Sequence, residues 1–374
     1  MSPRIMSVLF CSFAVVLLPY GSGSDSVAVR AQDKQDAEVV ARRIGKALQG
    51  EGQIETVVFS PDSKLLLAGF RTGFDYRRGG KAKLWNARTG ELVHVLEHGW
   101  FEKRNLGGVV AAGFSADGKL IVTGTDQGHP FAAGYHLGHH VVFETATGKR
   151  IGNPVFSSAH IDFVAFSPDQ KLVLVCQTDW KGMGNEKVLE AHATLRPVAG
   201  GDKLAGKAMF HNRWILAAAF SADGKRLVTG DSKGIIRTWQ VPEGKLEAKF
   251  GLEIKQDGDL VIKFSPDIKR VVIAGHLLQQ WDVATGKPVG DAIIGGARAI
   301  TYTPDGKTVL IGTGAKIRRY EAATWKRVGP SIRLPVDKER DDAMAFSPDG
   351  KTVVTTVFPK RGEKGSAQLW ELPD

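Results

Sequence analysis

The stretch AFSPDGKTVV, residues 345–354, joins two short apolar runs through the polar phrase Ser-Pro-Asp-Gly-Lys. Proline fits the second position of a type I turn, aspartate fits the third, and glycine takes the left-handed position that follows in a three-residue hairpin loop. The stretch therefore predicts a β-hairpin in which one strand ends at Phe346 and the next begins near Thr352.

The phrase occurs seven times, each time after an aromatic residue and between two apolar runs. The copies are SPDSK 60–64, SADGK 115–119, SPDQK 167–171, SADGK 221–225, SPDIK 265–269, TPDGK 303–307 and SPDGK 347–351. Their aromatic residues are 38 to 55 positions apart, a period typical of propellers. Ser63, Gln170 and Ile268 replace the glycine, and we expect a distorted turn at Ile268 because β-branched residues resist a positive φ.

Each repeat continues with a third run, a second turn such as ARTGE or VATGK, and a fourth run. In six repeats the third run ends in an aromatic residue: Trp85, Phe143, Trp239, Trp281, Tyr320 and Trp370. Repeat three has Leu195 near that position. Four strands per repeat predict an all-β, seven-bladed β-propeller of four-stranded antiparallel blades. We expect the aromatic residues to fill the space between neighbouring blades.

The seventh repeat stops after its third run, whereas the stretch 36–52 before the first repeat resembles a fourth strand. We expect Arg43 to Leu48 to pair beside Ala367 to Leu372 and close the ring, which removes an exposed sheet edge. A short amphipathic helix is the alternative, because Val40, Ile44 and Leu48 share helical spacing.

The pattern VAFSPDGK…LVTG…IRLWDVATGK resembles the WD-repeat family, the seven-bladed β-subunit type of propeller, over roughly residues 36–374. The resemblance implies a polar tetrad of His, Ser or Thr, Asp and Trp within a blade. In repeat four His211, Thr229 and Trp239 match, but the Asp position falls on Lys233. We therefore expect an incomplete tetrad, with blade rigidity resting more on apolar packing.

The N-terminus reads as a secretory signal peptide over residues 1–31. Arg4 precedes an apolar run, Met6 to Leu18, that is too short to span a bilayer comfortably, and Val29-Arg30-Ala31 offers a cleavage site. An uncleaved anchor is the alternative. We expect an exported protein, periplasmic or secreted, with no stable membrane insertion after cleavage. Residues 32–374 then form one propeller, with blades that start near 54, 108, 160, 213, 258, 297 and 341.

The mature chain contains one cysteine, Cys176, so an internal disulfide is excluded once the signal is removed. The net charge of the full chain is +10, which favours anionic partners, although general solubility explains it as well. The Lys and Arg residues are spread along the chain without a long basic run. The sequence accordingly does not indicate a specific nucleic-acid partner.

Long insertions occur in only a few of the predicted connections, and all of these lie on the face opposite the tight turns. They are 70–81, 125–139, 178–186 and 357–366 within repeats one, two, three and seven, and 98–108 between repeats one and two. Ring closure makes these blades neighbours, so the insertions crowd one sector of one rim. Function on a repeat scaffold commonly lies in such loops.

The insertions combine aromatic residues with cations, a composition typical of protein-binding hot spots. The candidate partner-binding residues are Tyr76, Arg77, Arg78, Trp100, Phe101, Arg104, Phe131, Tyr135, Trp180, Lys181, Lys360 and Arg361. The alternative is that the aromatic residues pack the loops onto the blades. We expect a monomer that binds a protein partner or an anionic polymer of the cell envelope.

Four histidines in repeat two are the weak alternative for a metal site: His129, His136, His139 and His140. Adjacent residues of a strand face opposite sides, which separates His139 from His140, and no cysteine or obvious carboxylate joins them. Ordinary surface histidines are therefore the favoured interpretation. We find no cofactor motif and no catalytic constellation, so we expect no cofactor and no enzyme; an exported propeller hydrolase or quinone-dependent dehydrogenase is the alternative.

Overall fold

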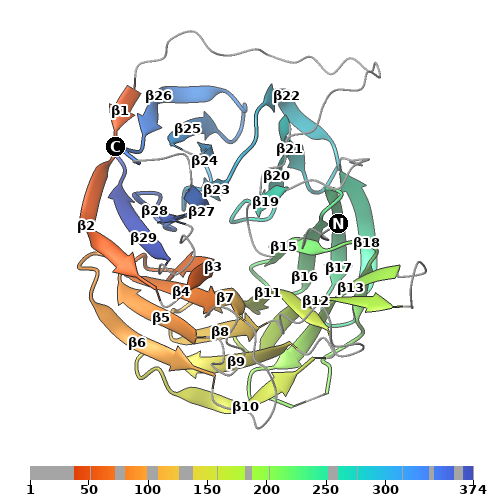
Figure 1. The fold of residues 1–374 in the computed structure, drawn as a ribbon. Coiled ribbons are helices and arrows are strands. Elements are labelled where there is room, and N and C mark those ends of the chain that lie inside the picture. Colours follow the sequence, from red (N-terminus) through yellow and green to blue (C-terminus); the bar gives the residue numbers. More distant parts are fainter. Residues whose placement is uncertain are drawn as a thin grey trace, which may run out of the picture.

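The chain forms a ring of seven sheets around a central axis (Figure 1). The computed structural model describes residues 38–50, 52–71, 81–98, 108–125, 138–157, 159–181, 188–201, 203–251, 260–275, 277–313, 315–336, 341–357 and 365–373. These ranges contain strands and turns and no helix. Accordingly, no helix able to cross a bilayer occurs in the described part of the chain.

In six blades the four strands follow one another in chain order from the axis outward, whereas the outer strand of blade seven comes from the N-terminal segment. Blade one contains β3 (Gln53–Phe59), β4 (Leu65–Arg71), β5 (Lys81–Asn86) and β6 (Leu92–Glu97). Blade two contains β7 (Val109–Phe114), β8 (Leu120–Thr125), β9 (His139–Glu144) and β10 (Arg150–Phe156). Blade three contains β11 (His160–Phe166), β12 (Leu172–Lys181), β13 (Val188–Pro197) and β14 (Met209–His211). Blade four contains β15 (Ile215–Phe220), β16 (Arg226–Asp231), β17 (Ile235–Gln240) and β18 (Lys245–Gly251).

The remaining blades contain both ends of the described chain. Blade five contains β19 (Val261–Phe264), β20 (Arg270–Ala274), β21 (Leu277–Asp282) and β22 (Pro288–Ile294). Blade six contains β23 (Ala299–Tyr302), β24 (Thr308–Thr313), β25 (Lys316–Glu321) and β26 (Arg327–Arg333). Blade seven contains β27 (Asp341–Phe346), β28 (Thr352–Val357), β29 (Ser366–Glu371) and, as its outer strand, β2 (Arg42–Gln49). The predicted fold class is confirmed.

The N-terminal segment closes the ring as predicted. Arg43 pairs with Trp370 and Leu48 with Ala367 in antiparallel β2–β29, so the helical alternative is wrong. A short strand, β1 (Glu38–Val40), precedes β2 and was not expected. It pairs in parallel with Ser331 to Arg333 of β26, which gives blade six a fifth strand. One segment therefore holds blades six and seven together.

The core lies between blades rather than within one layer. Leu67 and Leu84 of blade one pack with Val109, Ile121 and Phe143 of blade two, and all five are at most 1% exposed. Five of the six third-strand aromatic residues are buried: Trp85, Phe143, Trp239, Tyr320 and Trp370. The sixth, Trp281, is half-buried. Their predicted place at the seams is confirmed, and burial of apolar area there is the main stabilising contribution.

The seven Ser-Pro-Asp-Gly-Lys turns share one geometry. In the first, Ser60 Oγ donates to Asp62 Oδ1 (2.6 Å), and the same oxygen accepts the Lys64 amide (3.1 Å). The three non-glycine residues at the left-handed position have φ of 61° (Ser63), 59° (Gln170) and 52° (Ile268). The turn at Ile268 is not distorted, which corrects our expectation: the Ile268 amide still donates to the Ser265 carbonyl (2.9 Å). Strain at one residue is evidently less costly than rearranging the hairpin.

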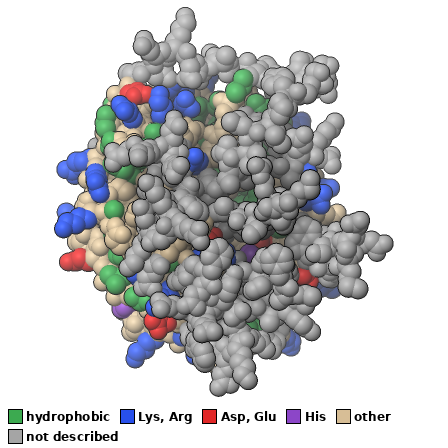
Figure 2. Space-filling view, in the orientation of Figure 1, with side chains coloured by type: hydrophobic (Ala, Val, Ile, Leu, Met, Phe, Trp, Pro, Cys, Tyr) green, Lys and Arg blue, Asp and Glu red, His purple; other side chains and the backbone are tan. Residues whose placement is uncertain are grey.

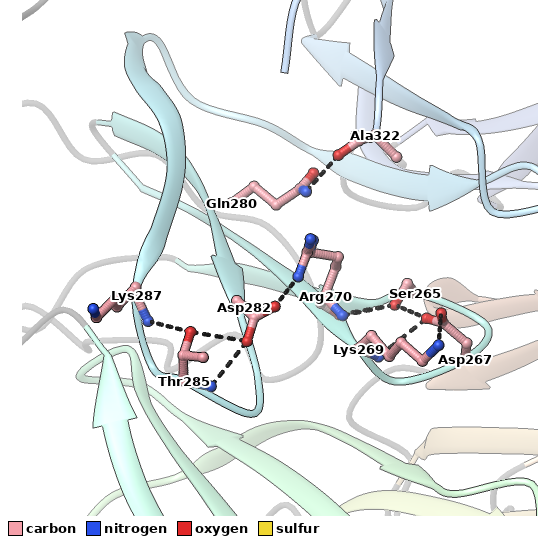
Figure 3. Close-up of polar contacts among 9 residues, drawn as sticks. All are labelled: Ser265, Asp267, Lys269, Arg270, Gln280, Asp282, Thr285, Lys287 and Ala322. Atoms are coloured by element: carbon pink, nitrogen blue, oxygen red, sulfur yellow. Dashed lines mark hydrogen bonds and ion pairs between the residues drawn. The ribbon is translucent and has the colours of Figure 1, made fainter. Parts of the chain in front are cut away.

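We call the face formed by these hairpin turns the turn face. Neighbouring turns touch there, because a Cβ at Gly118 of blade two would lie 3.8 Å from Pro61 Cδ of blade one. Figure 3 shows how blade five is fixed on this face: Arg270 of β20 forms an ion pair with Asp282 of β21, whose Oδ1 accepts the Thr285 amide (2.8 Å). Gln280 donates to the Ala322 carbonyl of blade six (2.6 Å). Blades are thus joined by polar contacts as well as by apolar seams.

The polar tetrad of blade four is complete, contrary to the sequence-based expectation. His211 Nε2 lies 2.9 Å from Thr229 Oγ1, and Trp239 Nε1 donates to the same oxygen (2.9 Å). The carboxylate comes from Asp231 rather than from position 233, with Oδ2 3.5 Å from His211 Nδ1. Arg237 donates to that oxygen (2.6 Å). Arg237 therefore bridges Asp231 and His211 beside their own contact.

Candidate insertion-bearing rim

The second face carries the connections between second and third strands and the links between blades, and we call it the insertion face. Most predicted site residues lie outside the described residues: Tyr76, Arg77, Arg78, Trp100, Phe101, Arg104, Phe131, Tyr135, Lys360, Arg361, His129 and His136. Trp180 and Lys181 lie at the end of β12. The site is built here from the described residues at which the insertions begin and end, which we call the insertion roots.

The roots of blades seven and one meet at two glycines. The Gly50 amide donates to the Gly365 carbonyl (2.8 Å), and the Gly365 amide donates to the Gly52 carbonyl (3.0 Å). A Cβ built at Gly50 would lie 2.4 Å from Cε1 of Phe70, which leaves no space for a side chain. The segment that follows insertion 358–364 is thus held against the end of β4, where insertion 72–80 begins.

The roots of the next insertions continue this arc. Gly108 follows insertion 99–107, and Arg71 is the last described residue before insertion 72–80. A Cβ built at Gly108 would lie 2.9 Å from the Cβ of Arg71. The Gly138 amide, after insertion 126–137, donates to Ala159 O (3.2 Å), and its carbonyl accepts the Ser157 amide of the link to blade three (2.8 Å). The insertion roots of blades seven, one, two and three therefore occupy one contiguous sector.

Blade three extends this sector with a long hairpin. The strands β12 and β13 pair for ten residues, from Leu172 with Pro197 to Lys181 with Val188. The inner strand β11 starts at His160, which pairs with Thr178, so the hairpin runs three residues beyond it. We predicted a loop from 178, but this part of the connection is strand through Lys181. The ladder hydrogen bonds of the hairpin give it a defined direction.

Acidic residues at bulges of the inner strands support the roots. The β3–β4 register shifts between Ile54 and Thr56, so Glu55 lies in a bulge, a device that re-aims a side chain. Glu55 is 4% exposed, and its carboxylate accepts from Arg71 Nε (2.7 Å). Because Arg71 ends at an insertion, this buried ion pair fixes the point from which the loop leaves.

A second acidic bulge occurs in blade three. Asp162 lies between the register positions Ile161 and Phe163, accepts a hydrogen bond from Thr178, and lies 3.6 Å from His160 Nδ1. Our sequence analysis missed Glu55, Arg71 and Asp162. The available signal was an acidic residue four positions before the aromatic residue of the turn, which occurs in ETVVF, DFVAF and DAMAF.

Three histidines at blade two are buried: His98 of the link from blade one, and His139 and His140 of β9. His98 Nε2 lies 2.6 Å from Thr123 Oγ1, and His139 Nδ1 lies 2.7 Å from Thr125 Oγ1. His139 and His140 are 1% and 3% exposed, so the interpretation of these two as surface histidines is wrong. Burial lowers the pKa of His139 to about 3 and that of His140 to about 4, so both rings are neutral at pH 7.

The described residues contain no group of three or more histidine, cysteine or carboxylate side chains that could hold a metal ion. One nitrogen of His139 is engaged by Thr125 within the blade. Cys176 is buried in β12, and burial raises the pKa of its thiol well above the usual value. The described part of the rim therefore supplies rigid loop attachment and charge rather than a nucleophile or a metal centre.

Comparison with known proteins finds similarity to WD-repeat proteins over parts of the chain. The family described as "WD domain, G-beta repeat" matches residues 207–240, which contain β14 through β17. The apoptotic protease-activating factor 1 of Rattus norvegicus is 37% identical over 109 residues, and that of Homo sapiens 33%. The WD repeat-containing protein WDS homolog of Arabidopsis thaliana is 27% identical over 161 residues, 40% of this chain and 30% of that protein.

These matches are partial. The alignment with the rat factor covers 27% of this chain and 9% of that protein. The chain therefore spans a small part of the length of the relatives that it matches. The shared part is repeat sequence, and what it supports directly is the propeller and its general use as a protein-interaction scaffold.

Proposed function

We propose that this chain, a seven-bladed WD-repeat propeller, is an exported, non-catalytic scaffold that binds a protein partner through the insertion-bearing sector. Its rigid ring holds loops at defined positions, which limits the conformational entropy lost on association. The partner contacts the predicted aromatic residues and cations of blades seven, one, two and three. No cofactor takes part, and the protein is a monomer before it binds.

One observation carries this proposal: the insertion roots of blades seven, one and two contact one another, and the root at Gly138 contacts the link to blade three. The Gly365, Gly50, Phe70, Arg71 and Gly108 contacts form an unbroken series across the seams between blades seven, one and two. The predicted insertions are 9 to 15 residues long, and loops that leave from adjacent points can build one composite surface. A protein interface of standard size needs about 800 Å² on each partner, more than one such loop supplies.

The surface charge agrees with this proposal. Lys and Arg side chains recur around the circumference of the molecule in Figure 2, with Asp and Glu between them. The formal net charge of the full chain is +10. Cations in the insertions accelerate association with an acidic partner by electrostatic steering. An anionic envelope polymer is recognised by the same chemistry, and strong weakening by salt would identify it.

Export is proposed from residues 1–31 alone. Cleavage after Ala31 gives a mature chain that begins shortly before β1, so the closing strands are retained. N-terminal sequencing of the protein from the periplasm or medium tests this: Gln32 as the first residue is the expected result. Recovery of the intact N-terminus in the membrane fraction would instead establish an anchor.

The partner-binding proposal is tested by affinity capture with the mature protein and two charge-reversed variants. The first is Arg77→Glu, Arg78→Glu, Lys360→Glu, Arg361→Glu on the insertion face. The matched control is Lys225→Glu, Lys269→Glu, Lys307→Glu, Lys351→Glu, which changes the net charge equally at exposed turn-face residues. Folding of each variant is verified by thermal unfolding.

The expected result is a protein that the wild type and the turn-face control capture and the insertion-face variant loses. Capture by all three proteins would place the binding surface elsewhere. Loss from both variants would show that binding depends on overall charge and would favour an anionic polymer. Turnover of a substrate by the purified wild type would overturn the non-catalytic part of the proposal.

A further inference from the structure

The outermost strand of each blade presents an edge with unpaired backbone groups, and such edges invite pairing with other chains. In the described structure β26 differs, because β1 lies along it. Natural proteins protect sheet edges with lysine or arginine, with proline, with short strands, or by covering them. The seven outer strands of this propeller can be compared on that basis.

Six outer strands carry at least one of these protections. Cations occur in β2, which reads RRIGKALQ, and in β18, which reads KLEAKFG. Proline occurs in β10 (Pro154), β22 (Pro288) and β26 (Pro330), and each of these strands also contains a glycine with positive φ. The sixth protected strand, β14, is only three residues long. The seventh outer strand, β6, carries none of these protections.

The sequence of β6 is LVHVLE, without lysine, arginine, proline or glycine. Leu92, Val93 and Val95 are 52%, 41% and 37% exposed, although all are aliphatic. A bulge at Val93 interrupts the pairing with β5, but His94 to Glu97 then pair regularly with Leu84 to Lys81. The outer edge is therefore regular over its second half and has an apolar surface.

The molecule itself shows that an outer edge accommodates another strand. On β26, three residues of β1 pair in parallel, and the Ala41 amide continues the pairing by donating to the Arg333 carbonyl (2.9 Å). Blade six thus has five strands without losing the four-strand core of the blade. The equivalent edge of blade one is long enough for six residues, about 20 Å at the usual rise per residue.

The charges around β6 specify what fits. Glu91 precedes the strand and Glu97 ends it, both exposed, so a carboxylate lies at each end of an apolar centre. Lys81 lies 3.6 Å from Glu97, but on the inner neighbour β5. The central His94 is turned toward blade two, where its Nε2 lies 2.9 Å from the Ala146 carbonyl. A cation at each end of an incoming strand would therefore meet a carboxylate.

We propose that β6 binds an extended segment of a partner protein as a fifth strand of blade one. In this segment every second residue is β-branched or otherwise aliphatic, and lysine or arginine stands at both ends. Backbone hydrogen bonds supply affinity, and the aliphatic residues and terminal cations supply selectivity. A second copy of this chain fits worse, because antiparallel β6–β6 pairing brings Glu91 of one copy beside Glu97 of the other. This surface is independent of the insertion-bearing sector.

The test uses fluorescein-labelled peptides and the mature full-length protein, followed by fluorescence anisotropy. The probe is Lys-Thr-Val-Thr-Val-Thr-Val-Lys. One control peptide has glutamate in place of both lysines, and another has alternate backbone nitrogens methylated, which removes donors while keeping the side chains. The protein variant is Val95→Lys, and its matched control is Leu246→Lys, which adds the same charge to an exposed aliphatic position of β18 (46% exposed).

We expect saturable binding of the basic peptide, and weaker binding of both control peptides. Val95→Lys should weaken binding of the basic peptide by at least about tenfold, whereas Leu246→Lys leaves it within about twofold. Absence of saturable binding, equal binding of the acidic peptide, or wild-type binding by Val95→Lys would each overturn the proposal. Sedimentation of the wild type as a dimer that Val95→Lys abolishes would assign β6 to a second copy instead.

Discussion

The guanidinium of Arg237 lies 2.7 Å from Nδ1 of His211. A guanidinium can only donate hydrogen bonds, so Nδ1 accepts and the ring proton is on Nε2, which donates to Thr229. His211 ends blade three, whereas Thr229 and Arg237 belong to blade four. The same guanidinium also bonds to Asp231, whose other oxygen accepts the Lys233 and Ile235 amides (3.0 and 3.1 Å). Arg237 therefore connects a buried charge, a tight turn and the seam between two blades.

Arg237→Met is expected to lower the free energy of unfolding by about 3 kcal/mol, because the Asp231 carboxylate then remains buried without a cation. The companion variant Arg237→Met, Asp231→Asn removes the charge while keeping an acceptor for the turn amides, and it should recover part of the loss. Urea unfolding of the wild type and both variants measures this. Equal loss in the two variants would show that Arg237 acts through packing alone.

The buried histidines predict a loss of stability in mild acid. Burial is the main cause that lowers the pKa of His139, His140 and His211 below the value of 6.5 expected in the unfolded chain. A lowered histidine pKa means that the unfolded state binds more protons, so stability is complete above about pH 7 and falls as pH drops below 6.5. Each such histidine whose pKa in the folded protein is 4 or less lowers the free energy of unfolding by about 2 kcal/mol at pH 5.

Unfolding free energies measured from pH 8 to pH 5 test this expectation, and His140→Leu is the informative variant. Between pH 8 and pH 5 this variant should lose less unfolding free energy than the wild type, and the difference should equal about the contribution of one histidine. The turn aspartates contribute little to the result, since their lowered pKa values, such as that of Asp117 at about 2, affect stability mainly below about pH 4. A pH profile unchanged by His140→Leu would contradict the assignment.

The turn geometry predicts opposite effects for two exchanges. Gly306 has φ of 68°, and a Cβ there would lie 3.9 Å from Pro266, so Gly306→Ile meets backbone strain without a clash. We expect a loss of about 1–2 kcal/mol. Ile268→Gly relieves the same strain but removes a half-buried side chain that packs on the core between blades four and five. It should therefore raise the free energy of unfolding by less than Gly306→Ile lowers it. The denaturation midpoints of both variants test these expectations. If Gly306→Ile left the stability unchanged, the turn would have adopted a different type.

Ring closure depends on β2, and Leu48 is the residue that tests it. Its side chain is 4% exposed and packs in the cluster that contains Trp85 and Ala367, across the seam of blades one and seven. Leu48→Ala should cost about 2–5 kcal/mol. Lys46→Ala on the same strand is the matched control, because Lys46 is exposed and its replacement should change stability little. Equal effects of the two variants would contradict the role of β2 in the core.

The candidate site could be predicted only in part. Loop length and position indicated which blades carry insertions, and pairing of Arg43 with Trp370 makes those blades neighbours. The ion pair of Glu55 and Arg71, by contrast, depends on a bulge in which β3 has one extra residue, Glu55, between positions paired with consecutive residues of β4. Bulges leave no strong mark in a single sequence, because the inserted residue can be of almost any type.

The amino-acid sequence by itself determined the local units of this protein. The repeated Ser-Pro-Asp-Gly-Lys phrase sets the hairpins, and the aromatic residues set what the seams bury. Only the tertiary structure decided which distant groups meet: β1 beside β26, Asp231 in place of residue 233, and His140 inside a blade. Turn preferences act within a few residues and can be read from the chain, whereas parallel pairing, histidine burial and carboxylate partners depend on which blades become neighbours when the ring closes.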